Sequence, residues 1–128
     1  MCVLYIISNE PLDFIVALNR NAKYIRRGDC PRKCIFKYNQ ITLPTSSAGF
    51  DNVKGQMRDS VNFVKRNIKI FNAILDKKVK AQVFIDFATD NLLSGQCYMN
   101  EVDFKVKDMA LLSSLNIGIK LSIYTTSG

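Results

Sequence analysis

Apolar residues between positions 51 and 78 recur at helical spacing. Successive positions are three or four residues apart, which places their side chains in one stripe on an α-helix. The stripe comprises Val53, Met57, Val61, Val64, Ile68, Phe71 and Leu75. Most Lys and Arg residues of this stretch lie away from the stripe. We therefore predict one long amphipathic helix over about 52–77, with Asp51 as its N-cap.

Three other segments have strand patterns. Residues 80–87 and 117–124 alternate between apolar and polar positions, which is typical of strands with one buried face. Residues 2–8 are apolar at nearly every position, as in a central strand. Shorter strands are predicted at 34–38 and 40–43 and, after a turn at 90–95, at 96–99.

Two shorter helices complete the pattern. The first follows Asn9, a candidate N-cap, and ends near Asn21, whereas the second covers 106–115. Residues 44–49 read as a flexible loop before the long helix. The predicted fold class is α+β: a mixed, largely antiparallel β-sheet with one long helix (about 52–77) and shorter helices packed on it.

The length of 128 residues fits one domain, 1–128. No apolar run approaches the roughly 20 residues that span a bilayer, so we expect no membrane insertion. The apolar start of the chain carries no basic residue before it and is better explained by a buried strand than by an export signal. We therefore expect a cytoplasmic protein. The pattern does not predict the oligomeric state.

The net charge of +7 is unevenly distributed. Residues 1–80 contain 15 Lys and Arg against 6 Asp and Glu, whereas residues 81–128 contain 3 against 5. Much of the excess falls in the turn-rich segment 20–37, where Asp29 is the one acid. A surface of this kind attracts acidic proteins or nucleic acids.

The sequence contains little evidence for an enzyme active site. The chain has no histidine, the usual acid–base residue at neutral pH. The carboxylate pairs Asp86 with Asp90 and Glu101 with Asp103 could hold Mg²⁺, but charged turn residues are ordinarily solvated. The four cysteines are Cys2, Cys30, Cys34 and Cys97. Cys30 and Cys34 are separated by three residues, not the two of the common zinc motifs, and a zinc site would have to recruit Cys2 and Cys97 as well. We predict reduced thiols, no metal, no cofactor and no enzymatic activity.

Basic and aromatic side chains are interleaved in and beside segment 20–37. Arginine pairs bidentately with carboxylates, and tyrosine is a frequent interface anchor. The same combination of cations and rings also suits nucleic acid. The candidate partner-binding residues are Arg20, Lys23, Tyr24, Arg26, Arg27, Arg32, Lys33 and Tyr38.

The order of elements resembles a family of small bacterial α+β domains of unknown function that includes toxin-immunity-like proteins. The resemblance rests on the closing helix and strand at 111–118 and 119–124, and on segments 7–13 and 27–29. It implies a protein that binds and neutralises a cognate toxin. Our leading hypothesis is therefore a protein-binding module for an acidic partner, and the resemblance implies that this partner is a toxin domain. The alternative is a nucleic-acid-binding protein that uses segment 20–37.

Overall fold

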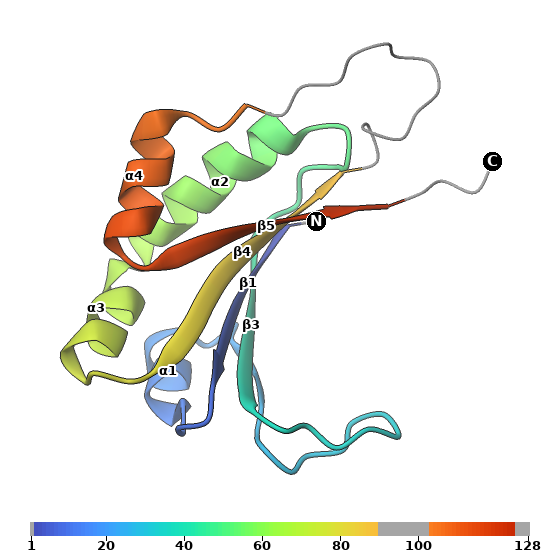
Figure 1. The fold of residues 1–128 in the computed structure, drawn as a ribbon, viewed down its shortest axis with the longest axis vertical. Coiled ribbons are helices and arrows are strands. Elements are labelled where there is room, and N and C mark those ends of the chain that lie inside the picture. Colours follow the sequence, from blue (N-terminus) through green and yellow to red (C-terminus); the bar gives the residue numbers. More distant parts are fainter. Residues whose placement is uncertain (1, 90–102, 125–128) are drawn as a thin grey trace.

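The computed structural model of the protein describes residues 2–89 and 103–124. Strands and helices are interspersed along this part of the chain, and Figure 1 shows their arrangement. In chain order they are β1 (Cys2–Ser8), α1 (Asp13–Leu18), β2 (Lys23–Ile25), β3 (Asn39–Ser46), α2 (Val53–Arg66), α3 (Ile68–Asp76), β4 (Ala81–Thr89), α4 (Val106–Ser114) and β5 (Ile117–Ile123).

The five strands form one sheet in the order β2-β3-β1-β4-β5. The first four strands pair antiparallel, and β5 joins β4 in parallel. The prediction of an α+β fold with a mixed, largely antiparallel sheet is therefore confirmed. Helices α2, α3 and α4 lie against one face of the sheet, so that the opposite face is left without a helical layer in the described part of the chain (Figure 1).

The alternation along β1 explains this one-sided arrangement. Leu4 and Ile6 are fully buried beneath the helices, whereas Tyr5 and Ile7, on the other face, are half-buried. The predicted inward face of β4 is confirmed, because Val83, Ile85 and Phe87 are all buried. Burial of each large apolar side chain contributes about 1.5–3 kcal/mol, which makes this layer the main source of stability.

The predicted long helix is wrong, because α2 and α3 are separate helices that meet at Asn67. Asn67 has φ −112° and ψ 28°, outside the helical region. Its side-chain Nδ2 donates to the Phe63 carbonyl at 2.9 Å, and its Oδ1 accepts from Asn19 Nδ2 at 3.1 Å. An asparagine side chain that bonds to the preceding turn offers the backbone an alternative to continued helix.

Both predicted N-caps are also wrong by a few residues. Asn52 caps α2 in place of Asp51, and its Oδ1 accepts from the Gly55 N–H at 2.9 Å. Helix α1 begins at Asp13 after Leu12, without a side-chain cap, and ends at Leu18. The carbonyl of Asn9 instead accepts a hydrogen bond from Asn39 at 3.4 Å.

The short strands were predicted less accurately than the long ones. The segment predicted as a strand at 34–38 lies outside β3, and the predicted loop at 44–49 begins within it. Pro44 is tolerated because β2 pairs only with residues 40–42, so β3 has no second described neighbour at Pro44. Strand β2 was not predicted. The predictions of helix α4 and of strands β4 and β5 are confirmed. The predicted strand 96–99 lies outside the described residues.

Gln56 joins helix α2 to strand β4. The side chain is fully buried. Its Oε1 accepts from the Ala88 N–H at 3.0 Å, and its Nε2 donates to the Ala88 carbonyl at 2.8 Å. A second bond from Nε2 reaches the Gly49 carbonyl at 2.8 Å. The amide therefore satisfies two strand groups and fixes the loop that precedes α2.

We predict that Gln56→Leu lowers the free energy of unfolding by about 1–3 kcal/mol or more, because the buried Ala88 groups lose their partner. Chemical denaturation of the wild type and the variant measures this loss. Asn62→Leu is the matched control, since Asn62 is exposed on the same helix and its replacement should stay within about 0.5 kcal/mol. Equal effects of the two substitutions would contradict the role given to Gln56.

Asp59 gives α2 a pH-dependent contact with β3. Its Oδ2 accepts from the Ser46 hydroxyl at 2.6 Å, and Arg58 lies 3.4 Å from its Oδ1. The Ser46 hydrogen bond, assisted by Arg58, lowers the pKa of the Asp59 carboxyl below its usual value.

A lowered pKa in the folded state means that this contact stabilises the protein above the unfolded-state pKa of about 3.9 and is lost as the pH falls through the folded-state pKa. We therefore predict that Asp59→Asn reduces stability at pH 7 and has little effect at pH 2.5. Thermal unfolding at the two pH values tests this. An equal loss at both would show that the carboxylate charge is not involved.

Candidate functional site

Residues 26–38 form an irregular hairpin between β2 and β3. The Gly28 N–H donates to the Phe36 carbonyl at 2.8 Å, and the Phe36 N–H donates to the Asp29 carbonyl at 2.9 Å. Gly28 has φ 92°, a conformation that residues with a side chain rarely adopt. Nearer the tip of the hairpin, Arg32 and Cys34 form an isolated β-bridge.

Asn39 fixes the base of this hairpin. Its buried side chain accepts from the Arg27 N–H at 2.9 Å and donates to the Glu10 carbonyl at 2.9 Å. One amide thus joins the hairpin to the loop between β1 and α1. Such fully satisfied buried polar groups fix a particular local arrangement.

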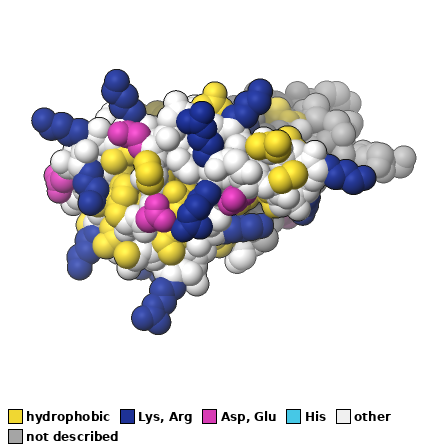
Figure 2. All heavy atoms as spheres, turned by 90° about the horizontal axis from the view of Figure 1, so that it is seen from below, with side chains coloured by type: hydrophobic (Ala, Val, Ile, Leu, Met, Phe, Trp, Pro, Cys, Tyr) yellow, Lys and Arg dark blue, Asp and Glu magenta, His cyan; other side chains and the backbone are white. Residues whose placement is uncertain are grey.

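A hollow of about 520 Å³ lies between the hairpin and the β1–α1 loop, and we call it the hairpin hollow. Its lining combines apolar, aromatic and basic side chains. The lining residues are Asn9, Arg27, Gly28, Ile35, Phe36, Lys37 and Tyr38. Ile35 is 66% exposed and Tyr38 is 50% exposed, so two large apolar side chains lie at the surface of one hollow. Figure 2 views the molecule from this end and shows apolar side chains between projecting Lys and Arg side chains.

The predicted partner-binding residues do not form one cluster. Arg27 and Tyr38 meet in the hairpin hollow. Arg32 and Lys33 are exposed nearer the hairpin tip, and Arg20 is exposed in the turn after α1. Lys23 of β2 pairs with Thr42 of β3, and the Lys23 side chain lies on the face of the sheet opposite to the helices.

The two remaining predicted residues make contacts within the protein. Tyr24 packs against the core, and its hydroxyl accepts from the Leu12 N–H at 2.9 Å. Arg26 lies over the Tyr24 ring at 4.5 Å and donates to Asp13 Oδ1 at 3.0 Å. These contacts order the start of α1, so Tyr24 and Arg26 have a structural use that their sequence pattern did not reveal.

The acids of this end are engaged internally as well. Asp29 accepts from the Arg26 N–H at 2.9 Å, and Glu10 accepts from the Lys80 N–H at 2.7 Å. Residues 26–38 contain five Lys and Arg residues against the single acid Asp29, so the hairpin carries a net positive charge. Within the described residues, Arg26 is the one cation of segment 20–37 that forms an ion pair.

Ile35 and Lys37 were not among the predicted site residues. The strand predicted at 34–38 would place the Ile35 side chain on one face of the sheet. A usable signal was present, because the short apolar run of residues 34–36 lies between basic residues in a turn-rich segment, where few apolar neighbours are available to cover it. Both residues line the hairpin hollow.

A second surface lies on the open face of the sheet. The rings of Tyr5 on β1 and Phe84 on β4 stack with centroids 5.2 Å apart. Lys120 Nζ lies 5.7 Å from the centroid of the Phe84 ring. Burial, together with the nearby Asp86 carboxylate, raises the pKa of the Tyr5 hydroxyl, which therefore stays protonated at neutral pH.

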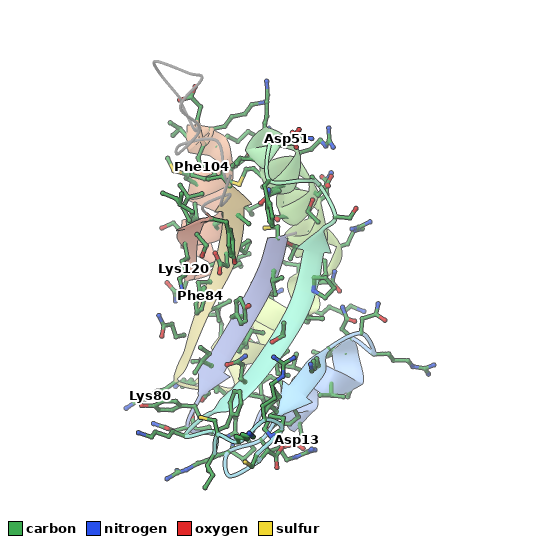
Figure 3. All side chains as sticks on the ribbon, turned by 90° about the vertical axis from the view of Figure 1, so that its right-hand side faces the viewer. Asp13, Asp51, Lys80, Phe84, Phe104 and Lys120 are labelled. Atoms are coloured by element: carbon green, nitrogen blue, oxygen red, sulfur yellow. The ribbon has the colours of Figure 1, made fainter. Side chains whose placement is uncertain are left out.

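This face also carries an open hollow of about 830 Å³, which we call the sheet hollow. Its lining includes Ile7, Gln82, Phe84, Gly118 and Lys120. In Figure 3, which faces this side of the sheet, Lys80, Phe84 and Lys120 follow one another along the β4 side.

The predicted carboxylate pairs are described only in part. Asp86 accepts from the Ser122 hydroxyl at 2.7 Å, whereas Asp90 and Glu101 lie outside the described residues. No group of three or more potential metal ligands occurs in residues 2–89 and 103–124.

The cysteines occupy contrasting environments. Cys30 and Cys34 are exposed in the hairpin, whereas Cys2 is buried and lies 3.3 Å from the Ser60 hydroxyl. Cys2 starts β1 opposite Ser46, and the hairpin enters the other end of β3 at Asn39, about 20 Å away. Cys2 therefore cannot join Cys30 and Cys34 around one metal, and Cys97 lies outside the described residues.

We predict that Cys30 and Cys34 react readily with iodoacetamide in the folded protein, whereas Cys2 reacts only after denaturation. Burial raises the pKa of the Cys2 thiol, so that the reactive thiolate is scarce and shielded from the reagent. Mass spectrometry of the alkylated peptides, with and without denaturant, measures the three rates. Rapid alkylation of Cys2 in the native protein would contradict the burial described here.

No helix among the described residues is long and apolar enough to cross a membrane. Comparison of the chain with family models, with curated proteins and with solved structures finds no match.

Proposed function

We propose that this protein is a binding protein without enzymatic activity, and that the hairpin hollow docks onto an acidic partner protein. The observation that carries the proposal is the exposure of Ile35 and Tyr38 beside Arg27 and Lys37. Protein interfaces commonly combine a desolvated apolar centre with a polar rim. Binding of this kind needs no catalytic group.

The local structure supports a preorganised surface. The hairpin is tied to the β1–α1 loop through Asn39, and its strands are joined by the Gly28–Phe36 and Phe36–Asp29 hydrogen bonds. A surface that is ordered before binding loses less conformational entropy when the partner docks. The outward cations would also speed encounter with an acidic partner.

The resemblance to toxin-immunity-like proteins suggests a finer proposal, in which the acidic partner is a toxin domain. A binder of this size could neutralise a toxin by covering its active site or its target-binding surface. The proposal predicts that the captured partner is harmful when it is expressed alone and harmless when the two proteins are expressed together.

Nucleic acid is the alternative ligand for segment 20–37. The internal contacts of Tyr24 and Arg26 occupy one ring and one cation that either ligand could use, so what favours a protein partner is the exposed Ile35, which has no counterpart in a phosphate or a base-stacking site.

We predict that Ile35→Ser combined with Tyr38→Ser weakens the partner complex at least about 30-fold, since central apolar anchors contribute about 2 kcal/mol or more to an interface. The tagged protein would be purified from untreated and from nuclease-treated lysates of its native cell. The acidic partner would be identified, and its affinity for each variant would be measured by calorimetry. Ile35 and Tyr38 are exposed, so the substitutions should leave the fold intact.

Val106→Ser is the matched control, because Val106 is a 78% exposed aliphatic residue on α4. Equal weakening by the control and the double variant would remove the hairpin hollow from the interface. Recovery of nucleic acid alone, lost on nuclease treatment, would replace the protein partner by the alternative ligand.

A further inference from the structure

We propose that the open face of the sheet binds single-stranded nucleic acid, with a base stacked on Phe84 and adjacent phosphates bound by Lys120 and Lys80. This surface is separate from the hairpin hollow, and the proposal does not depend on the function proposed for that hollow. It rests on an aromatic pair, a hollow beside it and a row of cations.

The aromatic pair supplies the stacking platform. Phe84 and Tyr5 lie on neighbouring strands in direct register, and their rings are stacked. Tyr5 supports one side of Phe84. Aromatic rings on a sheet face stack with bases of any sequence, because every base has a π-face.

Gly118 keeps space open next to this platform. It is the register partner of Phe84 on β5, and both residues line the sheet hollow. A Cβ atom at Gly118 would lie 3.7 Å from the Cβ of Phe84, an ordinary van der Waals contact. A larger side chain would therefore be accepted by the backbone and would fill the space that a base needs.

The cations continue the platform in both directions. The Lys120 backbone pairs with Asp86, two residues or about 7 Å beyond Phe84 along the sheet. Its Nζ lies over the Phe84 ring, 5.7 Å from the centroid, so the amine moves from the ring to the adjacent phosphate when a base stacks there. Lys80 precedes β4 and lies about 13 Å from Phe84 in the opposite direction. Figure 3 shows Lys80, Phe84 and Lys120 in this order. An extended polyanion with bases between its charges matches this arrangement.

Asp86 is the one acid on this face of the described strands, and lysines outnumber it. The Asp86 carboxylate accepts a hydrogen bond from Ser122. Lys23 and Lys120 extend from strands on the same face. The charge of the face therefore favours a polyanion, whereas an acidic peptide would leave the stacked rings without a matching group.

The test is fluorescence anisotropy with labelled oligodeoxyuridylate and oligouridylate of about 12 nucleotides, within the usual site sizes, and with a duplex of the same length. We expect both single strands to bind more tightly than the duplex. Log affinity should fall with log salt with a slope of about −1.4 if two phosphates are neutralised. A preference for one single strand identifies the sugar that is recognised.

Two variants test the stacking. Phe84→Leu keeps an apolar side chain but removes the ring, and Gly118→Val fills the space beside it. Each is expected to weaken binding about 5- to 150-fold, the loss of one stacked base. Thermal unfolding should show that both variants remain folded. Unchanged affinity in folded Phe84→Leu protein would overturn the proposal.

Matched charge variants test the position of the phosphates. Lys120→Glu should weaken binding and reduce the salt slope, whereas Lys65→Glu, on an exposed position of α2, should leave both unchanged. Equal effects would reduce the binding to net charge and overturn the proposal. Absence of oligonucleotide binding would also overturn it, and dimerisation sensitive to Phe84→Leu would then identify a second copy of this chain as the occupant.

Discussion

The structure depends on one-sided burial of the sheet. Strand β1 lies between β3 and β4, and its Leu4 and Ile6 side chains are fully buried under the helices. The alternate residues Tyr5 and Ile7 point to the face that no described helix covers. Because strand side chains alternate between faces, one arrangement creates both the core and an accessible, partly apolar surface. The hydrophobic layer stabilises the fold, and the open face is available for binding.

Two buried amides connect this layered core to its loops. Gln56 binds Ala88 and Gly49, and Asn39 binds Arg27 and Glu10. Among the described residues, no buried side-chain nitrogen or oxygen lacks a hydrogen-bond partner. Satisfied buried groups of this type select one arrangement of the chain rather than adding much net stability. Asn39 therefore positions the hairpin, and Gln56 positions the start of α2.

The two candidate surfaces differ in chemistry. The hairpin hollow presents an exposed isoleucine and a tyrosine among cations, a combination suited to an acidic protein. The sheet hollow presents Phe84, which stacks on Tyr5, beside Lys120, a combination that suits a base and a phosphate. Ile35 belongs to the first surface and Phe84 to the second, so substitutions at these positions can separate the two proposed binding functions.

The sequence by itself determined the long strands, α4, the apolar stripe and the basic character of segment 20–37, because periodicity and charge are local properties. Tertiary structure decided the break at Asn67, where a side chain bonds to Phe63 and Asn19 and competes with the helix. It also decided that Tyr24 and Arg26 stabilise α1, that Ile35 stays exposed, and that Tyr5 meets Phe84. These outcomes depend on which strands pair and which loops meet, and such long-range contacts leave no periodic signal in the chain.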